Sequence, residues 1–358
     1  MATKYLSGNR LQGTAAERTA LNLSSPPATS WKELGRTTLT STNDSIDVSS
    51  FAAKDNLMIL CNVINSGGDF RTFWRFNSDT NSNYSQRYNT NGGSDSTNTS
   101  LNGTMDWNTA ESVQSFEVLN ITNIASQEKL GIKRKIGSNT AGAGNAPNRA
   151  EIVGKWANTS NQITSVSVGD AVDPKSGTGG IGSEVVVLGC DNDEADSGTN
   201  FWQELADVEL SSAGDTLNSG IFTAKKYLWV QIFGIASSNL DNVKIRFNNY
   251  SDSSYAYRHN SNGGSESTNT SDSGFNYVGT NAAHNHYVNM FVVNKSDKEK
   301  LAIIEQVRTD TGASNTPTRK EVVGKWAKTD QQIVRVTAVN GGSGDFASGS
   351  YIKVWGAN

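Results

Sequence analysis

Short apolar runs separated by polar turns dominate the chain from residue 31 onward. Residues 57–61 and 227–233 are almost wholly apolar and have the length expected for central strands of a sandwich. Turn signals, such as Asn102-Gly103 and residues 340–342, lie between the runs. No stretch after residue 31 has the length and periodicity of an amphipathic helix, so the pattern predicts an all-β chain.

A period of two fixes which side chains of one strand point inward. In residues 72–76, Trp74 and Phe76 alternate with Phe73 and Arg75, which predicts the first two inside and Arg75 outside. Residues 243–247 repeat the pattern, with Ile245 and Phe247 inside and Arg246 outside. Further strands are predicted near residues 115–121, 130–136, 162–168, 184–188, 288–293, 301–307, 332–339 and 351–355.

The strand pattern occurs twice because the chain is a tandem duplication. Residues 31–100 map onto residues 202–271 at a constant offset of 171, and the match resumes at residues 151–156 and 321–326 with an offset of 170. We therefore predict an arm (residues 1–30), a first domain (31–190), a linker (191–200) and a second domain (201–358).

About eight strands in each copy favour an antiparallel β-sandwich of the jelly-roll type. An immunoglobulin-like sandwich is the alternative, but the Cys-Trp-Cys spacing is missing and the unit is long for that fold. The expected architecture is two tandem jelly-roll-like domains behind a short N-terminal arm.

Composition narrows the set of partners. The net charge is −4 and the pI is about 5.5, with Lys and Arg dispersed, so nucleic acid is not an expected partner. No apolar run approaches the roughly 18 residues that span a bilayer, and residues 1–23 have no apolar region typical of an export signal. We expect no membrane span.

The first 30 residues have no second copy. Thr14 and Glu17 fit a capping box, which predicts a short helix over about residues 15–21. This segment is either a frayed tail or a docking arm that buries its leucines against a partner. The candidate anchoring residues are Leu6, Arg10, Leu11, Arg18 and Leu21.

Histidines and cysteines do not follow the repeat. His259, His284 and His286 all lie in the second copy; a His-x-His pair on a strand could hold a metal, but exposed strand histidines are the simpler interpretation. Cys61 and Cys190 fall at non-equivalent points, which predicts free buried thiols. We predict no metal and no cofactor.

Few acids recur in both copies, and the first copy has no histidine for a nucleophilic triad. The recurring acids are Glu33/Glu204, Asp95/Glu266, Glu128/Glu299 and Glu151/Glu321. The Asp95/Glu266 pair changes length, which a positioned general acid would not tolerate. We therefore expect no enzyme activity, and a glycan-cleaving enzyme is a third hypothesis only.

A polar block in each copy, residues 91–100 and 262–271, is the candidate binding surface. Its amides and hydroxyls could hydrogen-bond a sugar while a tyrosine ring stacks on it. The simpler interpretation is a structured loop whose side chains cap their own backbone. We also interpret Gly154-Lys155-Trp156 as a strand-edge turn with a core tryptophan. The candidate binding residues are Tyr84, Arg87, Asn91, Asp95, Tyr255, Arg258, Asn262 and Glu266.

Each copy opens with Trp-x-Glu-Leu, at Trp31 and Trp202, carries an Arg-Phe-Asn strand end and closes on Val-x-Gly. With the arm motif of residues 8–18, this resembles the β-sandwich virion structural proteins of tailed phages and related viruses. The resemblance implies a non-enzymatic virion protein assembled in the host cytoplasm, as a capsid-decorating or tail/fibre component.

In that role the arm would bind other virion proteins, and the chain would form a homo-oligomer, for example a trimer. The alternative is a glycan-binding receptor-recognition fibre or a cell-surface adhesin, located on the extracellular surface and using host glycan as its partner.

Overall fold

The computed structural model describes residues 31–68, 70–103, 113–170, 177–192, 200–237, 240, 242–277, 284–309, 313, 316–342 and 344–358. These residues form antiparallel strands and no helix, so the all-β, sandwich-like prediction is confirmed. Among them, no helix could span a lipid bilayer. The five candidate anchoring residues, the predicted arm helix and linker residues 193–199 lie outside the described residues.

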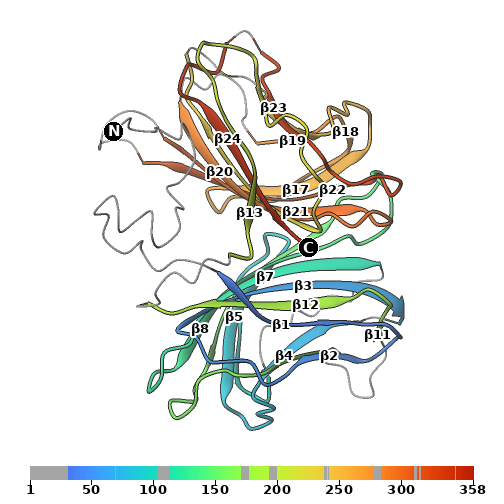
Figure 1. Ribbon diagram of the computed structural model, residues 1–358, viewed down its shortest axis with the longest axis vertical. Helices are drawn as coiled ribbons and strands as arrows, with labels where there is room; N and C mark the ends of the chain where they lie inside the picture. The colour runs from blue at the N-terminus through green and yellow to red at the C-terminus, as the bar shows by residue number, and fades with distance from the viewer. Residues whose placement is uncertain are drawn as a thin grey trace, which may run out of the picture.

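The first half consists of a large and a small sheet (Figure 1). The large sheet has the order β1-β12-β3-β7-β8-β9-β5-β6, with β11 paired to β3, and the small sheet has the order β2-β10-β4. The bounds are β1 Lys32–Thr38, β2 Ser45–Val48, β3 Asn56–Gly67, β4 Thr72–Phe76, β5 Tyr84–Thr90, β6 Ser96–Leu101, β7 Gln114–Thr122, β8 Lys129–Gly137, β9 Asn148–Trp156, β10 Val166–Asp170, β11 Thr178–Gly179 and β12 Glu184–Cys190.

The second half repeats this arrangement. Its large sheet has the order β13-β24-β15-β20-β21-β22-β17-β18, and its small sheet has the order β14-β23-β16-β19. The bounds are β13 Gln203–Glu209, β14 Thr216–Asn218, β15 Tyr227–Gly234, β16 Lys244–Phe247, β17 Tyr255–Ser261, β18 Ser267–Asp272, β19 Phe275–Asn276, β20 Asn285–Val293, β21 Lys300–Thr309, β22 Thr318–Trp326, β23 Val336–Val339 and β24 Tyr351–Ala357.

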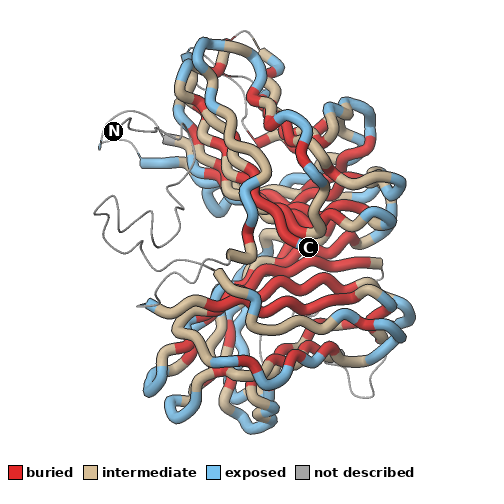
Figure 2. The backbone as a smooth tube through the Cα atoms, viewed as in Figure 1, coloured by how far each residue is buried: buried red, intermediate tan, exposed pale blue. Residues whose placement is uncertain are grey.

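Each half buries an apolar cluster between its two sheets. Trp74 and Phe76 lie in the first cluster and Ile245 and Phe247 in the second, as the alternation predicts. A third buried cluster joins residues of both halves, because the two large sheets face each other, and Figure 2 shows this buried band across the centre. The described residues therefore form four sheet layers with three apolar clusters between them.

Two predictions about local structure are wrong. The second parts of the polar blocks are not loops: they form the edge strands β6 and β18. The Gly154-Lys155-Trp156 segment is not a turn, because it forms the last residues of β9, although Trp156 is buried in the core as expected.

A third prediction is wrong in part: of the predicted strand 162–168, residues 162–165 precede β10 and do not belong to a strand. Asparagine side chains accept hydrogen bonds from the backbone N–H groups of this segment. Asn123 Oδ1 accepts from Ile163 N at 2.6 Å, and Asn77 Oδ1 accepts from Thr164 N at 2.8 Å. Asn294 makes the same contact to Ile333 in the second half, at 2.7 Å. Side-chain bonds of this kind replace the ladder of a sheet.

Candidate functional site

A groove of about 840 Å³ lies on the large sheet of the first half, on the face that turns toward the second half. Its apolar part consists of Leu130 and Ile132 of β8 and Val153 of β9, which are 57%, 54% and 46% exposed. These side chains point to this face because Lys129, Gly131 and Lys133 alternate with them toward the buried side.

Polar side chains of β5 and β6 form one wall of the groove. Arg87, Thr97 and Asn98 are among its lining residues, and the Arg87 guanidinium lies 3.5 Å from the exposed Asp95 carboxylate. Trp31 and the partly exposed Cys190 also line it. The site therefore combines an apolar floor with neutral hydrogen-bonding groups and two exposed cations, Arg87 and Lys155.

The counterpart of this apolar floor in the second half is covered. Leu301, Ile303 and Val323 are equivalent to Leu130, Ile132 and Val153 by the repeat offsets, yet they are only 0%, 4% and 3% exposed. They belong to the buried cluster between the halves, together with residues of the first half such as Phe116 and Val118. The halves thus pack asymmetrically, and one copy of a shared surface stays open.

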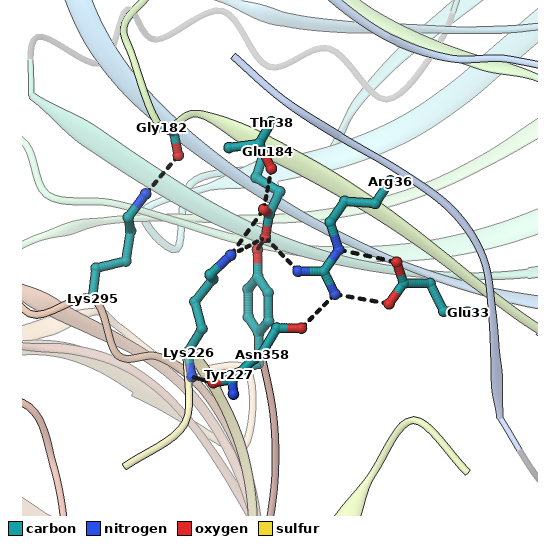
Figure 3. Close-up of polar contacts among 9 residues, drawn as sticks. All are labelled: Glu33, Arg36, Thr38, Gly182, Glu184, Lys226, Tyr227, Lys295 and Asn358. Atoms are coloured by element: carbon teal, nitrogen blue, oxygen red, sulfur yellow. Dashed lines mark hydrogen bonds and ion pairs between the residues drawn. The ribbon is translucent and has the colours of Figure 1, made fainter. Parts of the chain in front are cut away.

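A polar contact holds the covered side of this packing together. Figure 3 shows Arg36, Lys226 and Tyr227 converging on the buried Glu184 carboxylate. Lys226 Nζ and the Tyr227 hydroxyl donate to it at 2.9 Å and 2.8 Å. Burial alone would raise the pKa of Glu184, but hydrogen bonds from Thr38 and Lys226 outweigh it, and the pKa is lowered.

A second polar contact between the halves centres on Arg149. Its guanidinium contacts Glu151 of the same strand, and Glu266 and Glu321 of the second half at 2.9 Å and 3.0 Å. Burial and a hydrogen bond with Glu321 raise the pKa of Glu151 to about 7, against the opposing effect of Arg149. One arginine thus pairs with three carboxylates, and these ion pairs form part of the contact between the halves.

Two pairs of predicted binding residues form hydrogen bonds with the backbone. Tyr84 and Tyr255 are buried, and their hydroxyls accept from the N–H groups of Phe76 and Phe247 at 3.1 Å and 2.8 Å. Asn91 and Asn262 have positive φ and close the turns of the polar blocks, where their side-chain oxygens accept backbone N–H groups of β9 and β22.

The other four predicted binding residues have different surroundings in the two halves. Arg258 donates to the Pro147 carbonyl at 2.8 Å and Glu266 pairs with Arg149, so both take part in the contact between the halves. Their equivalents Arg87 and Asp95 stay exposed, and Arg87 lines the groove. The two polar blocks are therefore not equivalent surfaces.

The prediction that histidines lie exposed on a strand is wrong for His286. It is buried beside Tyr277, 3.4 Å from its hydroxyl, and burial lowers its pKa to about 4. No group of three or more His, Cys, Asp or Glu within the described ranges could hold a metal ion. Cys61 is buried as predicted, whereas Cys190 is partly exposed, against the prediction that both thiols are buried.

Several acids that recur in both copies make ion pairs. Glu33 lies 2.8 Å from Arg36, Glu128 lies 3.0 Å from Lys155, and Glu299 lies 3.9 Å from Lys325. Each pairing gives the carboxylate a structural role in its own layer or between layers.

Sequence reasoning missed the apolar floor of the groove. Residues 129–133 alternate in the sequence, but Leu130 and Ile132 have the same residue types as the equivalent Leu301 and Ile303. The sequence therefore does not distinguish the open copy from the covered one. No known protein family matches the chain, and no curated protein sequence matches it. The interpretation of the site therefore stands on its geometry.

Proposed function

We propose that this chain is a non-enzymatic structural protein of a virus particle, exposed as a capsid decoration or as part of a tail or fibre. The observation that carries the proposal is the packing of the two large sheets, which buries one copy of an apolar sheet face and leaves the equivalent face open. Such faces are suited to contact with other protein surfaces. The resemblance of the arm and strand motifs to virion proteins supports the same role.

The proposed anchor is the arm, residues 1–30, whose leucines would bury against another virion protein. Full-length chain carrying Leu11→Asp and Leu21→Asp should fold normally but be lost from particles purified on a density gradient. Ile221→Asp is the control, because that side chain is exposed and belongs to the second half, not to residues 1–30. Incorporation of the double variant at the level of the unchanged chain would refute the anchoring role, and absence of the unchanged chain from particles would refute the function.

A second candidate is glycan recognition by the first half alone. Arg87, Thr97 and Asn98 line the groove beside Trp31, a combination of donors, acceptors and an aromatic ring that sugars bind. On a glycan array, Arg87→Ala and Asn98→Ala should each abolish binding. Arg258→Ala is the matched control, since this equivalent arginine contacts the Pro147 carbonyl instead. An array without binding, or binding that both groove variants retain, would reject this candidate.

A further inference from the structure

We propose that the groove of the first half holds the arm of its own chain, with Leu21 and Leu23 on the apolar floor. The arm is residues 1–30, which lie outside the described residues. This inference goes beyond the proposed function, because it concerns the isolated chain and not the particle. Anchoring in a particle would require the arm to leave the groove.

The arm joins the described chain at one end of the groove. Trp31, the residue that follows the arm, lines the groove, and its carbonyl accepts from Phe201 N at 2.7 Å, which fixes this point beside the second half. From there the groove crosses the sheet strand by strand, past Cys190 of β12, Asn56 of β3 and Asn120 of β7, to the floor on β8 and β9. A segment that follows the groove away from Trp31 therefore reaches the floor.

The length of the arm fits this path. In the sheet order, β8 and β9 lie four and five strands from β1, which is about 19–24 Å at the usual strand spacing of about 4.8 Å. Leu23 lies eight residues before Trp31, and Pro26-Pro27 between them favours an extended stretch of about 25–27 Å, at about 3.1–3.4 Å per residue. Leu23 therefore reaches the floor, and Leu21, the last residue of the predicted arm helix, lies close enough to contact the same floor.

The second half covers only one end of the floor. Ile132 also lines a cavity of about 240 Å³ that extends to Asn289 and Phe291 of the second half. Leu130 and Val153 line the groove but not this cavity, and they stay 57% and 46% exposed. The exposed part of the floor is thus large enough to mark a contact site.

The duplication assigns this contact to the arm. Residues 1–30 have no second copy, and they precede the half whose floor is exposed. The half whose floor is buried is preceded by the linker instead, and the first half covers it. The segment without a counterpart therefore belongs to the same half as the floor without an equivalent cover.

The chemistry of the arm also matches the groove. Residues 19–30 contain no charged residue. The two cations of the groove, Arg87 and Lys155, lie 3.5 Å and 3.0 Å from Asp95 and Glu128, so the occupant need supply no charge. Leucine side chains of the arm would pack on the floor, while its amide and hydroxyl groups would bond to the polar side chains of β6.

Cys190 reports on the groove, because it lines the path from Trp31 and is partly exposed, whereas Cys61 is fully buried. The full-length chain carrying Leu21→Asp and Leu23→Asp should react with a maleimide at Cys190 about tenfold or more faster than the unchanged chain. The reason is that two charged side chains would leave the apolar floor and release the arm.

Two further variants show where the effect arises. Leu6→Asp, the same change in a distant part of the arm, should leave the rate unchanged, and Leu130→Asp in the floor should raise it as the arm variant does. A rate that Leu21→Asp and Leu23→Asp together leave unchanged would overturn the proposal. A rate that falls as the unchanged chain is concentrated would indicate a second copy in the groove, and it would overturn the proposal as well.

A disulfide shows whose arm lies in the groove. In a chain with Cys190→Ser, the pair Leu23→Cys and Val153→Cys should cross-link on mild oxidation, whereas Leu23→Cys with the exposed Ile221→Cys should not. An equal mixture of isotope-labelled and unlabelled chains should give cross-linked peptides that are wholly labelled or wholly unlabelled. Mixed peptides would assign the groove to the arm of another copy and, like a missing cross-link, would refute the proposal.

These experiments are separate from the test of the proposed function. They contain no other virion protein, so they can fail while the chain is still incorporated into particles. Conversely, absence of the chain from particles leaves the reaction rate and the cross-link unaffected.

Discussion

At the residue scale, a buried charged cluster distinguishes the first half from the second. Glu117, Lys133 and Lys135 have no exposed side-chain surface, and Lys133 Nζ lies 2.8 Å from the Glu117 carboxylate. Trp74 donates to the same carboxylate at 3.2 Å. Burial alone would raise the pKa of Glu117, but the two lysines outweigh it and the pKa is lowered. The equivalents of the three charged residues in the second half are Val288, Ile304 and Gln306.

Removing only the carboxylate should be costly. Glu117→Ala leaves two lysines buried beside each other, and we expect the free energy of unfolding to fall by about 3–5 kcal/mol. A combined variant with the residues of the second half, Glu117→Val, Lys133→Ile and Lys135→Gln, should lose less, because no charge remains buried. Urea unfolding followed by tryptophan fluorescence measures both. A greater loss in the combined variant would contradict this account.

At the element scale, two buried asparagines replace strand pairing before β10 and β23. Asn123 accepts from Ile163 N and donates to the carbonyls of Lys54 and Ile163, and Asn294 makes equivalent bonds. These side chains connect the large sheet to the segment that enters the small sheet. Their recurrence at an offset of 171 shows that both halves use the same device.

Asn123→Ala should lower the free energy of unfolding by about 1–3 kcal/mol, because it leaves a buried N–H and buried carbonyls without partners. The same change at Asn294 should cost about as much. Asn120→Ala, at an exposed position of the preceding strand β7, should change stability by no more than about 0.5 kcal/mol. Thermal or urea unfolding of the three variants gives the comparison, and equal stability of all three would reject the assigned role.

Strand prediction succeeded where one face of a strand is apolar and failed where both are polar. The alternation at Trp74 and Phe76 fixed the register, because a shift by one residue would expose both side chains. Residues 96–100 are all exposed, so no buried face marked β6 as a strand. Its pairing with β5 comes from backbone bonds that any sequence can make.

At the scale of the whole molecule, the contact between the halves contains two carboxyl groups whose pKa values are shifted in opposite directions. The pKa of Glu184 is lowered, so its contribution to stability is present above about pH 4.5 and is lost as pH falls through its folded pKa. The pKa of Glu151 is raised to about 7, so its contribution is present at low pH and is lost as pH rises through that value.

Glu151→Gln should therefore stabilise the chain at about pH 8, where the native carboxylate is charged and buried beside Glu321, and the advantage should shrink toward about pH 5. Urea unfolding at the two pH values measures it. Glu128→Gln is the control, because that carboxylate is partly exposed and pairs with Lys155 on a single sheet. A gain that does not depend on pH would contradict the raised pKa.

The sequence by itself determined the duplication, the all-β class and the inward side of strands such as residues 72–76, because a period of two and a repeat offset are properties of the chain alone. Only the tertiary structure decided which copy of a shared surface is covered. Leu130 and Leu301 are the same residue in the same local pattern, yet one is open and the other buried. The difference comes from the packing of one large sheet on the other, which brings together residues far apart in the chain.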